Sequence, residues 1–169
     1  MVVKFKGQPV AVGNGTELKV GDEAPVAKVV TTDLEEIEVG GGKDKVQVLI
    51  TVPSLDTPVC ATETKRFNEL IAGRADVFPV VISMDLPFAS KRFCSTEDIE
   101  NLVVASDFRY GDFKKKYSVE IKEGPLTGLL ARTVFIVGKD GKIKYIQVVP
   151  EITEEPNYDD ILKALEEIV

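Results

Sequence analysis

Short apolar runs separated by turn-forming residues dominate the first part of the chain, and they predict β-strands. The residues between the first two runs, Gly7 and Gln8, predict the turn of a β-hairpin, and Asn14-Gly15 is a second turn signal. Three glycines at 40–42 then interrupt the pattern. The predicted strands cover residues 2–6, 9–12, 26–30 and 36–39.

The centre of the chain alternates between continuous apolar runs, typical of buried strands, and helical patterns. Because strands joined by helices pair in parallel, this alternation predicts a parallel sheet core. The predicted strands cover residues 46–52, 77–82 and 102–105. The predicted helices cover residues 60–72, with Gly73 as a stop, and 88–94, 96–100 and 112–117.

Residues 133–137 and 143–149 predict an antiparallel pair joined at the tight-turn signal Asp140-Gly141. An amphipathic helix follows, with Asn157 as its N-cap. We therefore predict a single α/β domain over 1–169, with a mixed central sheet flanked by helices. This order of elements fits a thioredoxin-like fold with an N-terminal β-hairpin extension at 1–16.

The composition of the chain limits the partners and the compartment that we expect for the protein. With 21 basic and 28 acidic residues, the net charge is −7, which argues against nucleic acid and anionic membrane as partners. No apolar run is long enough to span a bilayer, and the N-terminus lacks the apolar segment of a secretory signal. We expect a cytoplasmic protein.

The residue types that are missing narrow the chemistry further. The chain has no histidine, which excludes Ser-His-Asp and Cys-His triads and histidine-containing zinc sites. Two cysteines are too few for Cys₄ zinc or iron–sulfur sites, and there is no glycine-rich dinucleotide motif. We expect no metal and no cofactor.

Cys60 lies between a predicted buried strand and a predicted helix. With Thr57 as N-cap and Pro58 at N1, Cys60 falls at N3, near unpaired backbone N–H groups and the positive end of the helix dipole. This position favours the thiolate, which is the nucleophilic form. The alternative is that Cys60 is a small buried apolar residue with no chemical role.

Residues 53–60 read Pro-Ser-Leu-Asp-Thr-Pro-Val-Cys. Their pattern Pro-x-x-x-Thr-x-x-Cys resembles the peroxiredoxin active-site motif, and the full string resembles the thiol peroxidase branch, the atypical two-cysteine peroxiredoxins. Residues 20–25, 83–89 and 92–94 also resemble this branch, and the similarity covers the whole chain. One departure is residues 137–141, a turn, where many peroxiredoxins have an Asp directly after the strand.

The resemblance implies that Cys60 is the peroxidatic cysteine, which attacks a hydroperoxide and becomes a sulfenic acid. It implies that Pro53 shields the sulfur and that Thr57 hydrogen-bonds to the sulfur and the peroxide, a role that competes with a simple N-cap. The reaction also needs a fixed cation, for which arginine is suited. The residues alone do not rank the five arginines, but the family pattern selects Arg132 over Arg66, Arg74, Arg92 and Arg109.

Cys94 resembles the resolving cysteine, which would condense with the Cys60 sulfenic acid to form an intrachain disulfide. The alternative is a permanent structural disulfide, which is unusual in cytosolic proteins. A disulfide requires Cα atoms within roughly 7 Å, and two cysteines in separate helices are not expected to meet this when reduced. We therefore predict local unwinding around both cysteines on oxidation.

The resemblance also implies hydrogen peroxide and organic hydroperoxides as substrates, thioredoxin as the reductant and a homodimer. One rival is a thiol–disulfide oxidoreductase, which the lack of a Cys-x-x-Cys motif weakens. Another is a binding module with two inert cysteines. The peroxidase assignment requires Cys60 to be ionised and reachable.

Overall fold

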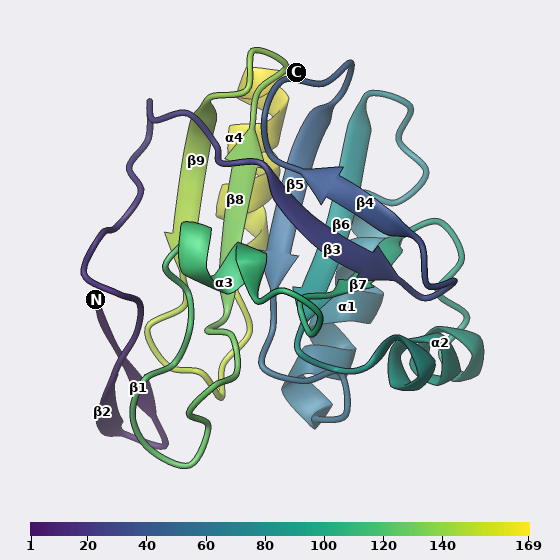
Figure 1. Cartoon of the computed structure of the whole chain (residues 1–169). Helices are drawn as coiled ribbons and strands as arrows, with labels where there is room; N and C mark the ends of the chain where they lie inside the picture. The colour runs from purple at the N-terminus through teal and green to yellow at the C-terminus, as the bar shows by residue number, and fades with distance from the viewer.

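The computed structural model describes residues 1–169 and contains nine strands and four helices (Figure 1). The strands are β1 (Val2–Phe5), β2 (Gln8–Ala11), β3 (Ala27–Thr31), β4 (Glu36–Val39), β5 (Val46–Thr51), β6 (Val77–Ser83), β7 (Val103–Ser106), β8 (Thr133–Val137) and β9 (Ile143–Val148). The helices are α1 (Pro58–Leu70), α2 (Pro87–Thr96), α3 (Asp112–Lys116) and α4 (Tyr158–Ile168). None of these helices is long and apolar enough to cross a membrane.

Seven strands form one mixed sheet in the order β4-β3-β7-β6-β5-β8-β9, and β1 and β2 form a separate hairpin. The predicted parallel core is confirmed, because β5 pairs with β6 and β6 pairs with β7 in parallel. The predicted β8–β9 hairpin is also confirmed as an antiparallel pair. The arrangement is that of the expected α/β fold.

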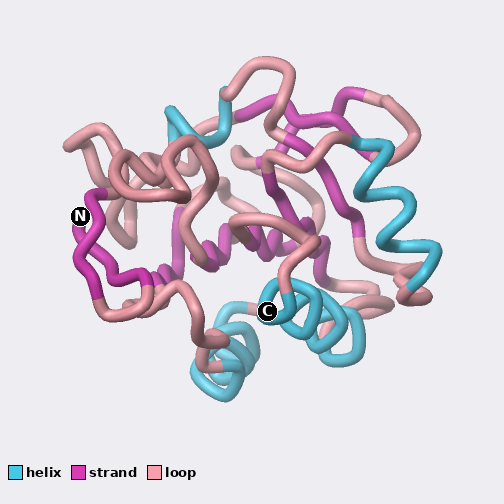
Figure 2. Tube along the Cα trace, turned by 90° about the horizontal axis from the view of Figure 1, so that it is seen from below, coloured by secondary structure: helices cyan, strands magenta, loops and turns pink.

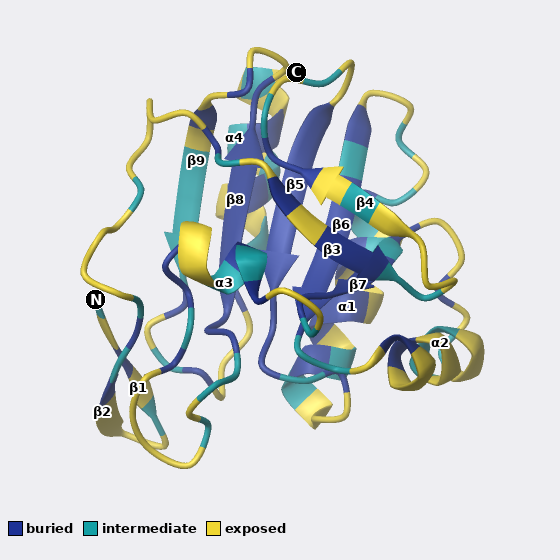
Figure 3. Cartoon of the chain, viewed as in Figure 1, coloured by how far each residue is buried: buried dark blue, intermediate teal, exposed yellow.

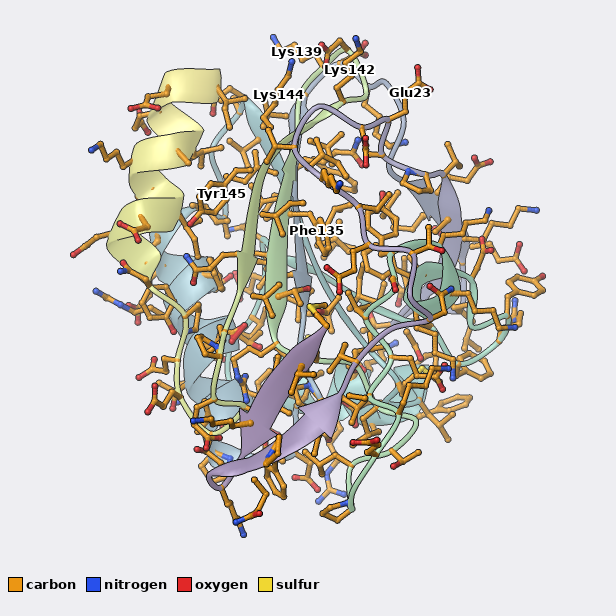
Figure 4. All side chains as sticks on the ribbon, turned by 90° about the vertical axis from the view of Figure 1, so that its left-hand side faces the viewer. Glu23, Phe135, Lys139, Lys142, Lys144 and Tyr145 are labelled. Atoms are coloured by element: carbon orange, nitrogen blue, oxygen red, sulfur yellow. The ribbon has the colours of Figure 1, made fainter.

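Helices cover both faces of the sheet, as predicted. Helices α1 and α4 lie together on one face and α3 lies on the other, which is clearest when the sheet is seen end-on (Figure 2). Neighbouring strands send side chains to each face: Tyr145 packs on the α1–α4 side and Phe135 on the α3 side (Figure 4). Each face therefore has its own apolar cluster, and the site described below lies on the α1 side.

The burial of the strands follows their position in the sheet (Figure 3). Every residue of the interior strand β5 is buried, including the polar Gln47 and Thr51, whose side chains hydrogen-bond to Gly40 N–H and Ala131 O. The edge strand β9 has mostly half-buried residues after Ile143. Strand β5 therefore lies in the interior of the sheet, and its carboxyl end leads into the Cys60 segment.

The N-terminal hairpin differs from its prediction by one residue. The turn falls at Lys6 and Gly7, which both have positive φ angles, of 51° and 81°, so that Gln8 belongs to the second strand. A two-residue turn that matches the twist of a hairpin requires both central residues in this region. The sequence signal from Gly7 was correct, but its position within the turn was wrong.

The predictions for α1 and α2 also need correction. Helix α1 ends at Leu70 rather than residue 72, because Ile71 leaves helical geometry with φ −130°. The two short helices predicted at 88–94 and 96–100 are one helix, α2. It ends where Asp98 takes a positive φ of 54° and Ile99 N–H donates to Cys94 O at 2.9 Å.

Candidate functional site

Cys60 lies at the start of α1, directly after the loop that follows β5. Thr57 is the N-cap with extended backbone angles and Pro58 occupies the first helical position, as predicted. Ala61 N–H donates to Thr57 O, but no acceptor in the chain takes the N–H of Val59 or Cys60. Because a helix begins with unpaired donors, this first turn presents positive potential around the sulfur.

The Cys60 thiol is free and has no exposed surface. It packs in the apolar cluster of the α1 face with Val52, Leu55 and Phe67. The expectation of a reachable sulfur is therefore not met in this conformation, because Cys60 is enclosed in this apolar cluster. Pro53, in the loop before Cys60, is also buried.

Arg132 directly precedes β8 and is only 2% exposed. Its guanidinium donates two hydrogen bonds to the carbonyl of Ile152, from Nε at 3.0 Å and Nη2 at 2.8 Å. Nη1 donates to Glu63 Oε1 at 3.0 Å. Burial works against this charge, but the charges of Glu63 and Cys60 outweigh it and raise the pKa of Arg132. The structure thus brings Arg132 and Cys60 into electrostatic contact.

The other four arginines lie elsewhere on the surface. Arg66 pairs with Glu69, Arg74 with Asp76 and Glu166, and Arg109 with Glu36. Arg92 is exposed on α2. Of the five, only Arg132 is buried and interacts with Cys60, whereas Arg92 lines a cavity beside residues 54–56.

Sequence reasoning missed Glu63, a fully buried carboxyl one helical turn beyond Cys60. Its Oε2 has no hydrogen-bond partner, and burial raises its pKa to about 7 although the charge and hydrogen bond of Arg132 oppose this. A signal was available, because Glu63 shares a helix face with Cys60 and Phe67, which a surface carboxyl would not.

Glu63 leads to a prediction about the pH dependence of stability. A carboxyl whose pKa is higher in the fold than in the unfolded chain stabilises the fold when protonated, so its contribution is lost as the pH rises from 4.5 to about 7. We expect the free energy of unfolding to fall by about 3 kcal/mol through this group. Denaturant unfolding across this range measures the loss. Glu63→Gln is neutral and should flatten the curve; parallel curves for the two proteins would contradict the prediction.

The loop before Cys60 is tied to the end of β6 by Asp85, whose role the sequence did not reveal. The Asp85 carboxylate accepts hydrogen bonds from Ser54 Oγ and Leu55 N–H, both at 2.7 Å, and from Ser83 Oγ at 2.8 Å. These contacts fix the loop from outside its own segment. Asp85 lies two residues before Pro87, the first residue of α2, so the two cysteine-bearing segments share this anchor.

Thr57 is exposed, and its hydroxyl does not cap α1. It donates instead to Ser54 O at 2.9 Å. The side-chain N-cap, which was the alternative to a functional role, is therefore not formed. Since a threonine hydroxyl has one hydrogen, Thr57 Oγ1 is left with lone pairs that only accept.

Cys94 lies in the last turn of α2 as a half-buried free thiol. Burial raises the pKa of this thiol to about 11, so it is protonated at neutral pH. A cavity of about 520 Å³ separates α2 from the loop before Cys60. It is lined by Ser54, Leu55, Asp56, Asp85, Ala89, Arg92, Phe93, Thr96 and Glu97.

Comparisons with known proteins find a family and relatives that match most of this chain. The model of the Redoxin family matches residues 19–162. A thiol peroxidase from Aquifex aeolicus is 62% identical over 167 residues, covering 99% of this chain and 98% of that protein. A thiol peroxidase from Campylobacter jejuni is 52% identical over 156 residues, covering 92% of this chain and 87% of that protein.

Among solved structures, a peroxiredoxin-like protein from Aquifex aeolicus superposes with a TM-score of 0.96 at 61% identity. The match covers 99% of this chain and 97% of that one. Relatives of this kind therefore extend over both the N-terminal hairpin and the Cys60 site.

Proposed function

Because this chain belongs to the Redoxin family, with thiol peroxidases as relatives over its whole length, we propose that Cys60 reduces hydroperoxides and that Cys94 resolves the oxidised product. The chain is a peroxidase enzyme, of the kind that reduces peroxide at a thiol. The observation that carries the residue assignment is the buried guanidinium of Arg132 beside a cysteine at a helix start.

In the first step, the Cys60 thiolate attacks the terminal oxygen of ROOH. The S–O bond forms as the O–O bond breaks, the leaving RO⁻ takes a proton to become ROH, and Cys60 becomes a sulfenic acid. Negative charge therefore moves from sulfur to the leaving oxygen. The free N–H groups of Val59 and Cys60 and the Arg132 guanidinium would stabilise the charge on both atoms.

Thr57 and Pro53 have complementary roles in this step. Thr57 Oγ1 donates its only hydrogen to Ser54 O, so it acts as an acceptor for the O–H of the peroxide. Pro53 keeps water from the sulfur. Because Cys60 has no exposed surface, the loop of residues 53–57 must shift to admit a peroxide.

In the second step, the Cys94 thiol condenses with the sulfenic acid to give a Cys60–Cys94 disulfide and water. Cys94 is protonated and half-buried in the folded helix, so α2 must open to bring a reactive thiolate to Cys60. The last turn of α2 is suited to this, because it closes on Asp98, a non-glycine residue with a positive φ. Such a turn is less costly to unwind than one closed by glycine.

A dithiol reductant must then reduce the disulfide, and we assign this role to thioredoxin. The cytoplasm is the fitting compartment, since thioredoxin keeps thiols reduced there.

Apolar side chains near the site, Leu55 and Val59, favour organic hydroperoxides as well as hydrogen peroxide. A homodimer is supported by the exposed apolar side chains of Leu86 and Phe88, which a second copy would cover; sedimentation velocity measures this.

Titration of free thiols tests the proposed function. One equivalent of hydrogen peroxide added to the reduced protein should lower the free thiols from two to zero, with no covalent dimer on a non-reducing gel. Two remaining thiols would identify an inert binding module. Oxidation by small disulfides that is faster than oxidation by peroxide would identify a thiol–disulfide oxidoreductase.

Hydrogen exchange, compared between the reduced protein and the peroxide-oxidised protein, tests the opening of α2. Amides in the last turn of α2 and the amide of Ala61, the first hydrogen-bonded amide of α1, should lose protection in the oxidised protein, while those of β5 should keep theirs. Equal protection of α2 in both samples would contradict the unwinding.

A further inference from the structure

The N-terminal hairpin lies against the segment that follows β9, at the opposite end of β9 from the Lys139–Lys142 turn (Figure 4). Lys4 N–H donates to Pro150 O at 2.7 Å, and Ile152 N–H donates to Lys4 O at 2.8 Å. The hairpin also shares an apolar cluster with this segment. A two-stranded hairpin is marginally stable alone, so these contacts hold it in place and are in turn held by it.

A single carboxylate fastens the tip of the hairpin. Glu151 Oε1 accepts from Gly7 N–H at 2.8 Å, and Oε2 accepts from Lys6 N–H at 3.2 Å. Oε2 also accepts from the backbone and the hydroxyl of Thr153, at 3.0 and 2.9 Å. The hydrogen bonds from Thr153 and Gly7 lower the pKa of Glu151 to about 2, so the carboxylate is ionised at neutral pH.

The residue next to Glu151 connects the hairpin to the active site. Ile152 is 3% exposed; its N–H is bonded to the hairpin at Lys4, and its carbonyl accepts both hydrogen bonds from Nε and Nη2 of Arg132. The position of this carbonyl therefore sets the orientation of the guanidinium plane. Glu63, the other partner, holds only Nη1.

We propose that Glu151 is a positioning residue for peroxide reduction: it locks the hairpin onto the segment of residues 150–153, which orients Arg132 through the carbonyl of Ile152. The inference rests on the proposed catalytic function of Arg132. It gives the N-terminal hairpin a role in the reaction, although the hairpin contributes no side chain to the Cys60 site.

The test compares two carboxylates that both hold the hairpin. Glu151→Gln weakens the contact that leads to Arg132, whereas Glu123→Gln weakens the contact of Glu123 Oε2 with Ala11 N–H, on the other strand of the hairpin and with no hydrogen bond to Ile152. Glu154→Gln is a control for loss of charge in the same segment. We expect Glu151→Gln to slow oxidation of Cys60 by hydrogen peroxide about tenfold. The two controls should stay within about twofold.

Two further readouts separate positioning from general stability. The first is the rate at which iodoacetamide alkylates Cys60 in a Cys94→Ser background, which rises with pH. This rise should occur at a higher pH in Glu151→Gln than in Glu123→Gln. In a background that lacks the Arg132 guanidinium, Arg132→Met with Glu63→Gln, the Glu151 substitution should have no further effect on peroxide oxidation, because its route of action is gone.

The outcomes are distinguishable. If Arg132→Met slows the reaction but Glu151→Gln does not, the positioning role is wrong and the proposed function stands. If Arg132→Met itself has no effect, the function proposed for Arg132 fails first. An equal loss of rate in Glu151→Gln and Glu123→Gln would show that the hairpin acts only through stability and would overturn the inference.

Discussion

Replacing Cys60 by serine is expected to abolish peroxide consumption, and replacing Cys94 by serine is expected to leave one rapid turnover. Serine at position 60 has a hydroxyl that stays protonated at neutral pH, so no nucleophile remains at the start of α1. Cys94→Ser keeps the nucleophile and removes only the thiol that condenses with the sulfenic acid. Peroxide consumption, followed with thioredoxin and its reductase present, measures both effects.

Each of these two variants is the control for the other, because each loses one cysteine sulfur and keeps the other. Cys94→Ser should consume one equivalent of peroxide per chain and accumulate a sulfenic acid, seen as a gain of one oxygen by mass spectrometry. Sustained turnover by Cys94→Ser would show that Cys94 is not the resolving residue. Consumption by Cys60→Ser would place the reactive sulfur elsewhere.

Substitution of Arg132 is expected to have the next largest effect. Three of its five N–H donors are bonded to Ile152 O and Glu63, which leaves one on Nη1 and one on Nη2 for the sulfur and the peroxide. Arg132→Met should slow the first oxidation of Cys60 by about 100- to 1000-fold, the usual cost of removing a preorganised donor to a developing charge. Rapid-quench thiol titration with hydrogen peroxide measures the rate.

The single variant Arg132→Met is expected to be destabilised, because it would leave Glu63 buried and unpaired. Breaking a buried ion pair on one side destabilises a protein by roughly 3–5 kcal/mol, whereas neutralising both partners is far milder. The combined variant Arg132→Met with Glu63→Gln therefore tests the chemistry in a folded protein. Glu63→Gln alone retains the guanidinium and is the matched control. A combined variant as fast as this control would refute the role of Arg132.

The parts of the site that are local in sequence could be predicted. Pro58 fixes the start of α1 and so places Cys60 in its first turn, because both effects act within a few residues. The buried runs of β5 and β6 predict parallel strands on similar grounds. The turn of the N-terminal hairpin was misplaced because the twist of the strands, rather than composition, decides which residues take positive φ.

The rest depends on contacts between distant segments. Arg132 could not be ranked among five arginines from the residues alone, since its partners Glu63 and Ile152 are 69 and 20 positions away. Asp85 was not recognised because its carboxylate holds a loop about 30 positions earlier in the chain. Charged residues that work in the interior look like surface residues until the fold shows what surrounds them.

The parallel pairing of β5 and β6 has a consequence for the durability of the enzyme. Both strands end at the same edge, where Thr51 lies opposite Ile82, and each leads into one of the two cysteine segments. The proposed Cys60–Cys94 disulfide therefore requires changes only in the segments beyond that edge, and the hydrogen bonds between β5 and β6 stay intact. The two cysteine segments can therefore change conformation and then return to the starting one, because the sheet to which both are attached keeps its structure throughout.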